Sequence, residues 1–320
     1  MKSHSLKKYL KLLITIAILS TIFIKFDINL GDIINRVKVK YLIIACLVRI
    51  FISPLISINR WKTFLFHAGI EETFFSLLKI SMLSAFFGIA LPSSQGADAI
   101  RMYLIEKKHK GKSLNFTTSS TVLMERIIGL VLLAFLGLIF GLITVFPNKM
   151  HVIIIILSIN VAIWLGIFTL TNQTLFNYFQ NKINQSKKFA RLNHFLIKTY
   201  YTFVNYPYRK VLASSILLIL SLQIITVIIV YLVFLAFGVD IPFSQHLVFY
   251  PIISILSIIP ISISGLGVRE GFFVYFYSLI GVSADIAVSV SLINYCIEIL
   301  LMAIMGGIIY IFDSIIIKKK

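Results

Sequence analysis

IIGLVLLAFLGLIFGLITVFPN, residues 127–148, contains no charged side chain. A transmembrane α-helix needs about 20 consecutive apolar residues. This stretch provides them before a Pro-Asn pair that favours a turn. A second apolar stretch follows at residues 152–171. We therefore expect two neighbouring membrane helices joined at this turn.

The composition of the whole chain agrees with a membrane protein. Hydrophobic residues make up 59% of the sequence and charged residues 13%, whereas soluble domains are about 45–50% apolar and about 25% charged. The net charge of +18 could indicate a nucleic-acid-binding protein, but apart from Arg49 and Lys79 the basic residues lie outside the apolar runs and gather between them. This pattern is typical of the loops of membrane proteins. We expect no nucleic acid partner.

Further apolar runs lie on both sides of these helices, at residues 12–24, 41–58, 74–91, 211–237, 247–263, 271–280 and 286–312. The first run resembles a signal peptide, but no small-residue cleavage site follows, so we expect an uncleaved helix. Residues 172–210 mix lysine and arginine with aromatic residues, and we expect a cytoplasmic basic and aromatic connection there. The predicted fold is an all-α polytopic membrane helical bundle, with residues 1–320 as a single integral membrane domain.

The basic residues also predict the topology. If every apolar run crossed the membrane, the basic segment Arg101–Lys112 would fall outside, against the tendency of such segments to stay in the cytoplasm. The conflict disappears if residues 74–103 form a re-entrant hairpin that turns at Pro92–Asp98. A similar hairpin at residues 247–280 would turn at Pro260–Gly267. We expect about six full spans and two re-entrant hairpins, about eight hydrophobic segments in all, with both termini cytoplasmic.

The turns of the two predicted hairpins resemble each other. Pro92–Arg101 and Pro260–Arg269 each place a proline nine residues before an arginine, with glycine and serine between them. Each motif is followed by a glutamate in an apolar helix, Glu125 and Glu298 respectively. Broken helices in corresponding halves of a chain indicate an inverted repeat with a central substrate site, and the helix that restarts beyond each break presents free N–H groups to an anion.

Ionisable side chains in apolar segments cost several kcal/mol when unpaired, roughly 3 kcal/mol or more. They either pair with one another, for example Arg269 with Glu298, or contact a charged headgroup or coupling ion. We interpret Arg49 as structural. We expect Arg101 and Arg269 to bind phosphate, and Glu125, Glu270 and Glu298 to hold these arginines or a cationic group. The candidate site residues are Pro92, Gly96, Asp98, Arg101, Glu125, Arg126, Pro260, Gly265, Gly267, Arg269, Glu270 and Glu298.

Signals for other chemistry are lacking in the sequence. The six histidines have no metal-ligand spacing, and the two cysteines, Cys46 and Cys296, lie in apolar surroundings. There is neither a phosphate-binding P-loop nor a Gly-x-Ser-x-Gly motif. We expect no metal, no cofactor and no catalytic residue. Three glycines of the central apolar run are expected to allow close helix packing: Gly129, Gly137 and Gly141.

The segments that carry these charges resemble those of a known family. They are Leu91-Pro92 with Gly96-Ala97-Asp98 and Arg101, Met124-Glu125-Arg126, and Gly265-Leu266-Gly267-Val268-Arg269-Glu270-Gly271. Together they are similar to the lysylphosphatidylglycerol synthase transmembrane region family, the flippase part of bifunctional synthase/flippase proteins. The resemblance covers nearly the whole chain. It implies translocation or binding of a charged lipid, aminoacylated or anionic, in the bacterial inner membrane.

The resemblance also bears on activity and partners. Full-length relatives carry a soluble aminoacyl-transferase domain, and we expect this chain to lack that activity. The alternative function is a membrane subunit of a lipid-modifying enzyme, of the phosphatidylglycerol lysyltransferase type or for polyprenyl-phosphate glycosyl transfer. A purely structural partner is a third alternative. Expected partners are a membrane lipid with a charged headgroup, a separate soluble synthase and further copies of the chain in a homo-oligomer.

Overall fold

The computed structural model describes residues 37–89, 96–109, 115–174, 176–177, 200, 208–259, 262 and 265–318. The regular structure in these ranges is helical. Among the described residues, five helices are long and apolar enough to cross a membrane: Val39–His67, Thr121–Ile143, Lys149–Thr169, Arg209–Ala236 and Ala284–Phe312. They correspond to five of the six predicted spans, and the remaining one, residues 12–24, lies outside the described residues. The predicted all-α membrane bundle is confirmed.

Two of these spans each contain a single π-helical turn, in which the helix widens. In chain order the described elements are α3 (Val39–Leu47), η1 (Val48–Ile52), α4 (Ser53–His67), α5 (Phe74–Ile89), α6 (Gly96–Lys108), α7 (Asn115–Ile143), α8 (Lys149–Thr171), α11 (Tyr208–Ala236), α12 (Phe243–Leu256), α13 (Val268–Ser278), α14 (Ala284–Tyr295), η4 (Cys296–Leu300) and α15 (Leu301–Lys318). The π-turns are η1 and η4.

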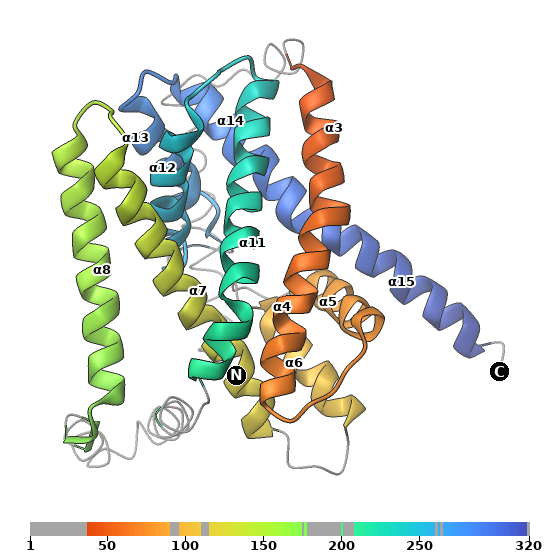
Figure 1. Ribbon diagram of the computed structural model, residues 1–320. Coiled ribbons are helices and arrows are strands. Elements are labelled where there is room, and N and C mark those ends of the chain that lie inside the picture. The colour runs from red at the N-terminus through yellow and green to blue at the C-terminus, as the bar shows by residue number, and fades with distance from the viewer. Residues whose placement is uncertain are drawn as a thin grey trace, which may run out of the picture.

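The spans alternate in direction between two ends of the bundle (Figure 1). We call one the basic end: α4 and α6 finish there, α7 and α11 begin there, and it carries Lys107, Lys108, Arg209 and Lys210. At the opposite end α3 begins beside the end of α11, where the Lys38 N–H donates to the Ala236 carbonyl at 2.8 Å. That the basic end faces the cytoplasm remains a prediction.

α5 and α6 form a hairpin that enters from the basic end. At its outer ends the Lys108 Nζ donates to the Ser76 Oγ at 2.7 Å. At its inner ends a Cβ added to Gly88 would lie 2.7 Å from the Ala97 nitrogen, so the backbones touch there. The 16 residues of α5 extend only about 24 Å, less than the roughly 30 Å hydrocarbon core.

α12 and α13 form the corresponding hairpin from the opposite end (Figure 1). Their outer ends meet where the His246 Nδ1 and the Tyr277 Oη lie 2.8 Å apart. Large buried side chains fill this region, including Phe234, Phe249 and Phe273. α12 ends at Leu256, before the end of the apolar run 247–263, whereas α13 begins at Val268, three residues before the run 271–280.

Glycines set several of the close approaches between helices. A Cβ on Gly306 of α15 would lie 2.0 Å from the Met82 carbonyl oxygen of α5, so these helices pack backbone to backbone. Gly137 and Gly141 of α7 allow close approach of the Pro251 side chain of α12 and the Ile156 side chain of α8, as predicted, whereas a Cβ on Gly129 would meet nothing within 4 Å. The packing role predicted for Gly129 is wrong.

The connection at residues 172–210 lies mostly outside the described residues. Within its described part, the rings of Phe176 and Tyr200 stack with centroids 4.0 Å apart.

Candidate functional site

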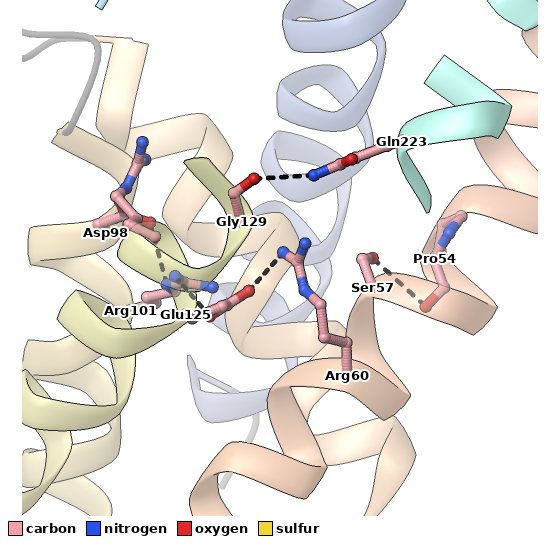
Figure 2. Close-up of polar contacts among 9 residues, drawn as sticks. Pro54, Ser57, Arg60, Asp98, Arg101, Glu125, Gly129 and Gln223 are labelled. Atoms are coloured by element: carbon pink, nitrogen blue, oxygen red, sulfur yellow. Dashed lines mark hydrogen bonds and ion pairs between the residues drawn. The ribbon is translucent and has the colours of Figure 1, made fainter. Parts of the chain in front are cut away.

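Charged side chains from three helices form one network beside the first hairpin. Its members, which we call the first charge cluster, are Arg60 of α4, Asp98 and Arg101 of α6, and Glu125 and Arg126 of α7. Figure 2 shows Arg60 and Arg101 reaching Glu125 from different helices. The Arg101 Nη2 donates to the Glu125 Oε2 at 2.9 Å, and Arg60 donates to the other carboxylate oxygen. Asp98 pairs with Arg101, whose Nε lies 3.0 Å away, and with Arg126.

Burial makes the pairing of Glu125 necessary. Glu125 is 3% exposed, and the side chains of Arg60 and Arg101 are 19% and 14% exposed. A carboxylate this deep is stable as an ion only with good ionic and hydrogen-bonding partners. Three guanidinium groups surround two carboxylates, so the first charge cluster keeps one excess positive charge.

Local sequence explains how Arg101 is placed. The buried Gly96 begins α6, and Asp98 lies in its first turn, where a negative charge complements the helix dipole. Asp98 and Arg101 then lie three residues apart on one face. The guanidinium of Arg101 also lies over the Trp61 ring, 5.0 Å from its centroid, so it is packed as well as paired.

The second hairpin holds its arginine differently. The Arg269 Nη2 donates to Glu270 Oε1 at 2.9 Å, and the Arg269 Nε donates to Ser291 Oγ at 3.1 Å. The guanidinium lies 4.7 Å from the centroid of the Tyr295 ring. Glu270 is fully buried, and its second oxygen accepts the N–H of Gly267 at the start of α13. We call Arg269, Glu270, Ser291 and Tyr295 the second charge cluster.

The turn that precedes α13 depends on two glycines. Gly265 and Gly267 have φ angles of +76° and +85°, which side chains with a Cβ rarely adopt. A Cβ on Gly265 would also lie 3.2 Å from the Ser257 carbonyl oxygen. Both residues are therefore required by the backbone geometry that presents Arg269.

Glu298 belongs to neither cluster. Its Oε1 accepts a hydrogen bond from the Tyr250 hydroxyl at 2.9 Å, and its backbone carbonyl accepts one from the Arg49 Nη2 at 2.7 Å. Within the described ranges, no cationic side chain forms an ion pair with the Glu298 carboxylate. The suggested pairing of Arg269 with Glu298 is wrong, because Arg269 is held by the adjacent Glu270.

A cavity of about 250 Å³ lies between the first hairpin and the span that contains η4. It is bounded by α5, by the start of α6, and by the two π-turns and their neighbours. The described lining residues are Arg49, Ser81, Ser84, Ala85, Gly88, Ile89, Ala97, Asp98, Arg101, Tyr295, Glu298, Ile299 and Met302. Two guanidinium groups and two carboxylates therefore face one space inside the bundle.

The cavity brings together only part of the predicted site. Asp98, Arg101 and Glu298 line it, whereas Arg269 and Glu270 are not among the described lining residues. Glu125 and Arg126 support the first charge cluster from α7, and Gly96, Gly265 and Gly267 shape the helix starts. Pro92 and Pro260 lie outside the described residues.

Three residues that contribute to the site were not predicted from the sequence. The predicted apolar run 41–58 stops before Arg60, but α4 continues to His67 and carries Arg60 into the first charge cluster. The buried Trp61, Phe64 and Leu65 were the signal, because their helical spacing continues beyond Ile58. Arg49 was interpreted as structural, yet it lines the cavity. Tyr250, which binds Glu298, had no local signal.

A second cavity, of about 710 Å³, opens at the basic end between α4 and α6. Glu72 lies there, with Lys108 Nζ 2.6 Å and His109 Nε2 3.5 Å from its carboxylate oxygens. Partial burial acts to raise the pKa of Glu72, but hydrogen bonds from Lys108 and Ser76 and the nearby positive charge outweigh it, so the pKa is lowered. Nowhere in the described part of the chain do three His, Cys, Asp or Glu side chains gather closely enough to hold a metal ion.

Comparison with known protein families matches residues 9–306 to the family model described as lysylphosphatidylglycerol synthase TM region. No curated protein and no solved structure matches the chain.

Proposed function

Because this chain belongs to the lysylphosphatidylglycerol synthase transmembrane region family, we propose that it moves a phospholipid with a charged headgroup between the leaflets of the bacterial inner membrane. The observation that carries the proposal is the cavity lined by Arg49, Asp98, Arg101 and Glu298. Charged groups inside a membrane bundle that face a cavity, instead of only one another, are typical of substrate pathways. The acyl chains would stay in the lipid while the headgroup enters the bundle.

Arg101 is the group that we assign to the headgroup phosphate. It faces the cavity, and Asp98 and Glu125 fix its position. A guanidinium held in this way binds a phosphate oxygen without first losing much conformational freedom. The excess positive charge of the first charge cluster adds to the attraction for an anion.

Glu298 is the group that we assign to a positive part of the headgroup, such as an amine. Among the described residues, its carboxylate has only the neutral Tyr250 hydroxyl as a partner, so a cation in the cavity would complete its environment. Arg269 is assigned a supporting role, because it packs on Tyr295, which lines the same cavity. This supporting role replaces the direct contact with phosphate that the sequence predicted for Arg269.

The two hairpins supply a route for the headgroup. α5 and α6 enter from the basic end, and α12 and α13 enter from the opposite end (Figure 1). Short helices that enter from opposite faces around a central site suit alternating access. Movement of α5 and α6, which line the cavity, would open it toward the basic end, and α12 of the second hairpin contacts the cavity residue Glu298 through Tyr250.

The proposal is tested by blocking the cavity without removing a charge. Ala85 lines the cavity, whereas Ala162 of α8 is exposed on the outside of the bundle. Vesicles of phosphatidylcholine and phosphatidylglycerol, with a trace of fluorescent phosphatidylglycerol, report translocation through quenching of the outer leaflet. We expect Ala85→Leu to slow translocation at least tenfold and the matched Ala162→Leu to leave it unchanged.

The arginine assignment is tested in the same vesicles. Arg101→Lys keeps the charge but loses the planar fork that binds two oxygens, and we expect translocation to fall at least tenfold while the variant still inserts. Translocation at the wild-type rate in both Ala85→Leu and Arg101→Lys would overturn the proposal.

A further inference from the structure

The two π-turns of the described chain meet at the cavity. Arg49 lies in η1 and Glu298 in η4, and these residues are 249 positions apart in the sequence. The Arg49 Nη2 donates to the Glu298 carbonyl oxygen at 2.7 Å. π-turns interrupt the regular hydrogen-bonding ladder of a helix and are frequent at functional sites. Here a side chain from one π-turn binds the backbone of the other.

Among the described residues, Arg49 has one hydrogen-bond acceptor, a neutral backbone carbonyl. Its guanidinium carries five N–H groups, and the hydrogen bond to the Glu298 carbonyl satisfies one of them. The Nε is buried and has no hydrogen-bond partner in the described part of the chain. Arg49 is partly buried, and no carboxylate in the described residues forms an ion pair with it. The guanidinium therefore has unused capacity for an anion, and it faces the cavity.

A phosphate oxygen is a stronger acceptor for a guanidinium than a backbone carbonyl, because both groups are charged and can form two parallel hydrogen bonds. We propose that Arg49 is a positioning residue that exchanges these partners: it holds the π-turn of Glu298 while the cavity is empty and moves to the phosphate when a phosphate-bearing headgroup binds. This inference rests on the proposed function of the cavity.

When Arg49 changes its hydrogen-bond partner, headgroup binding would be linked to a change in the span that closes the cavity. η4 separates α14 from the tilted α15, which packs on α5 through Gly306 (Figure 1). Without Arg49, the Glu298 carbonyl in η4 loses the hydrogen-bond donor that comes from another helix. Within the described ranges, the side-chain hydrogen bond that still holds Glu298 is the one from the Tyr250 hydroxyl to its carboxylate. Release of η4 would loosen the junction of α14 and α15, beside the inner end of the first hairpin.

Amide hydrogen exchange measures this release directly. The full chain in detergent is exposed to dihexanoyl phosphatidylglycerol or to dihexanoylglycerol, which has the same acyl chains and no phosphate. Equilibrium dialysis measures binding separately. In the wild type, we expect phosphatidylglycerol, but not dihexanoylglycerol, to raise exchange in residues 296–304 at least threefold. In Arg49→Ala, exchange in this segment should be high without lipid and insensitive to it, while Arg209→Ala, an exposed arginine of α11, behaves as wild type.

The possible outcomes separate the inference about Arg49 from the proposed function. Bound phosphatidylglycerol with unchanged exchange in residues 296–304 would overturn the inference and leave the proposed function standing. Absence of phosphatidylglycerol binding to the wild type would overturn both. If Arg49→Ala raises exchange throughout the bundle, Arg49→Lys decides. A lysine can still donate one hydrogen bond to the Glu298 carbonyl but lacks the fork that binds two phosphate oxygens, so lipid-free exchange in residues 296–304 should stay at the wild-type level and phosphatidylglycerol should raise it less than in the wild type. A lipid-induced rise in Arg49→Lys equal to that of the wild type would contradict the exchange of partners.

Discussion

Removal of the Glu125 carboxylate tests whether the first charge cluster stabilises the bundle. In Glu125→Ala, Arg60 and Arg101 lose their shared partner. Breaking a buried ion pair on one side costs about 3–5 kcal/mol. Arg101 keeps Asp98 and Arg60 is partly exposed, so the lower value of about 3 kcal/mol applies. At about 2 °C per kcal/mol for a large chain, the midpoint of thermal unfolding should fall by about 6 °C.

Thermal unfolding of the purified protein in detergent, followed by intrinsic fluorescence, measures this midpoint. The matched control is Arg126→Ala in the same cluster, because the Arg126 side chain is 40% exposed and an exposed pair contributes only about 0–1 kcal/mol. We expect its midpoint to fall by no more than about 2 °C. Equal midpoints for Glu125→Ala and Arg126→Ala would refute the reasoning, since burial would then not determine the cost.

Two further predictions concern packing and pH. Gly306→Ala should lower the unfolding midpoint, because its Cβ would overlap the Met82 carbonyl and overpacking costs about 1–3 kcal/mol, whereas Gly271→Ala, with nothing within 4 Å, should not. A midpoint unchanged by Gly306→Ala would contradict the close contact of α5 and α15. Because the pKa of Glu72 is lowered in the folded protein, its contribution is present at neutral pH and is lost as the pH falls below about 4.5 toward that lowered pKa. Lys108→Met should weaken this acid-induced loss of stability relative to Lys107→Met, and identical profiles from pH 6 to 3 would count against the Glu72–Lys108 pair.

The spans and hairpins were predictable because a bilayer imposes strict rules on the backbone. Apolar runs of sufficient length mark helices, and basic segments fix which runs cross and which return. The same rules led to an error at Arg60. The apolar run stops at Ile58, so the helix was expected to stop there, but α4 continues to His67 because Arg60 is neutralised by Glu125, 65 positions away.

The partners of the charged residues were harder to predict than their positions. Arg269 pairs with its neighbour Glu270 because that glutamate is fixed by the Gly267 N–H, a detail of the helix start that spacing does not reveal. Neither π-turn has a signal in the sequence, and so the contact of Arg49 with the Glu298 carbonyl could not be predicted. The glycines at 265 and 267, in contrast, were expected in a turn and have the positive φ angles that require them.

The most direct measurement of the central assignment is a cryo-electron microscopy structure of the chain in nanodiscs that contain phosphatidylglycerol. We predict headgroup density inside the cavity between α5, α6 and η4, with a phosphate about 3 Å from the Arg101 guanidinium. Headgroup density only outside the bundle, or only in the cavity of Glu72 and Lys108 at the basic end, would contradict the account.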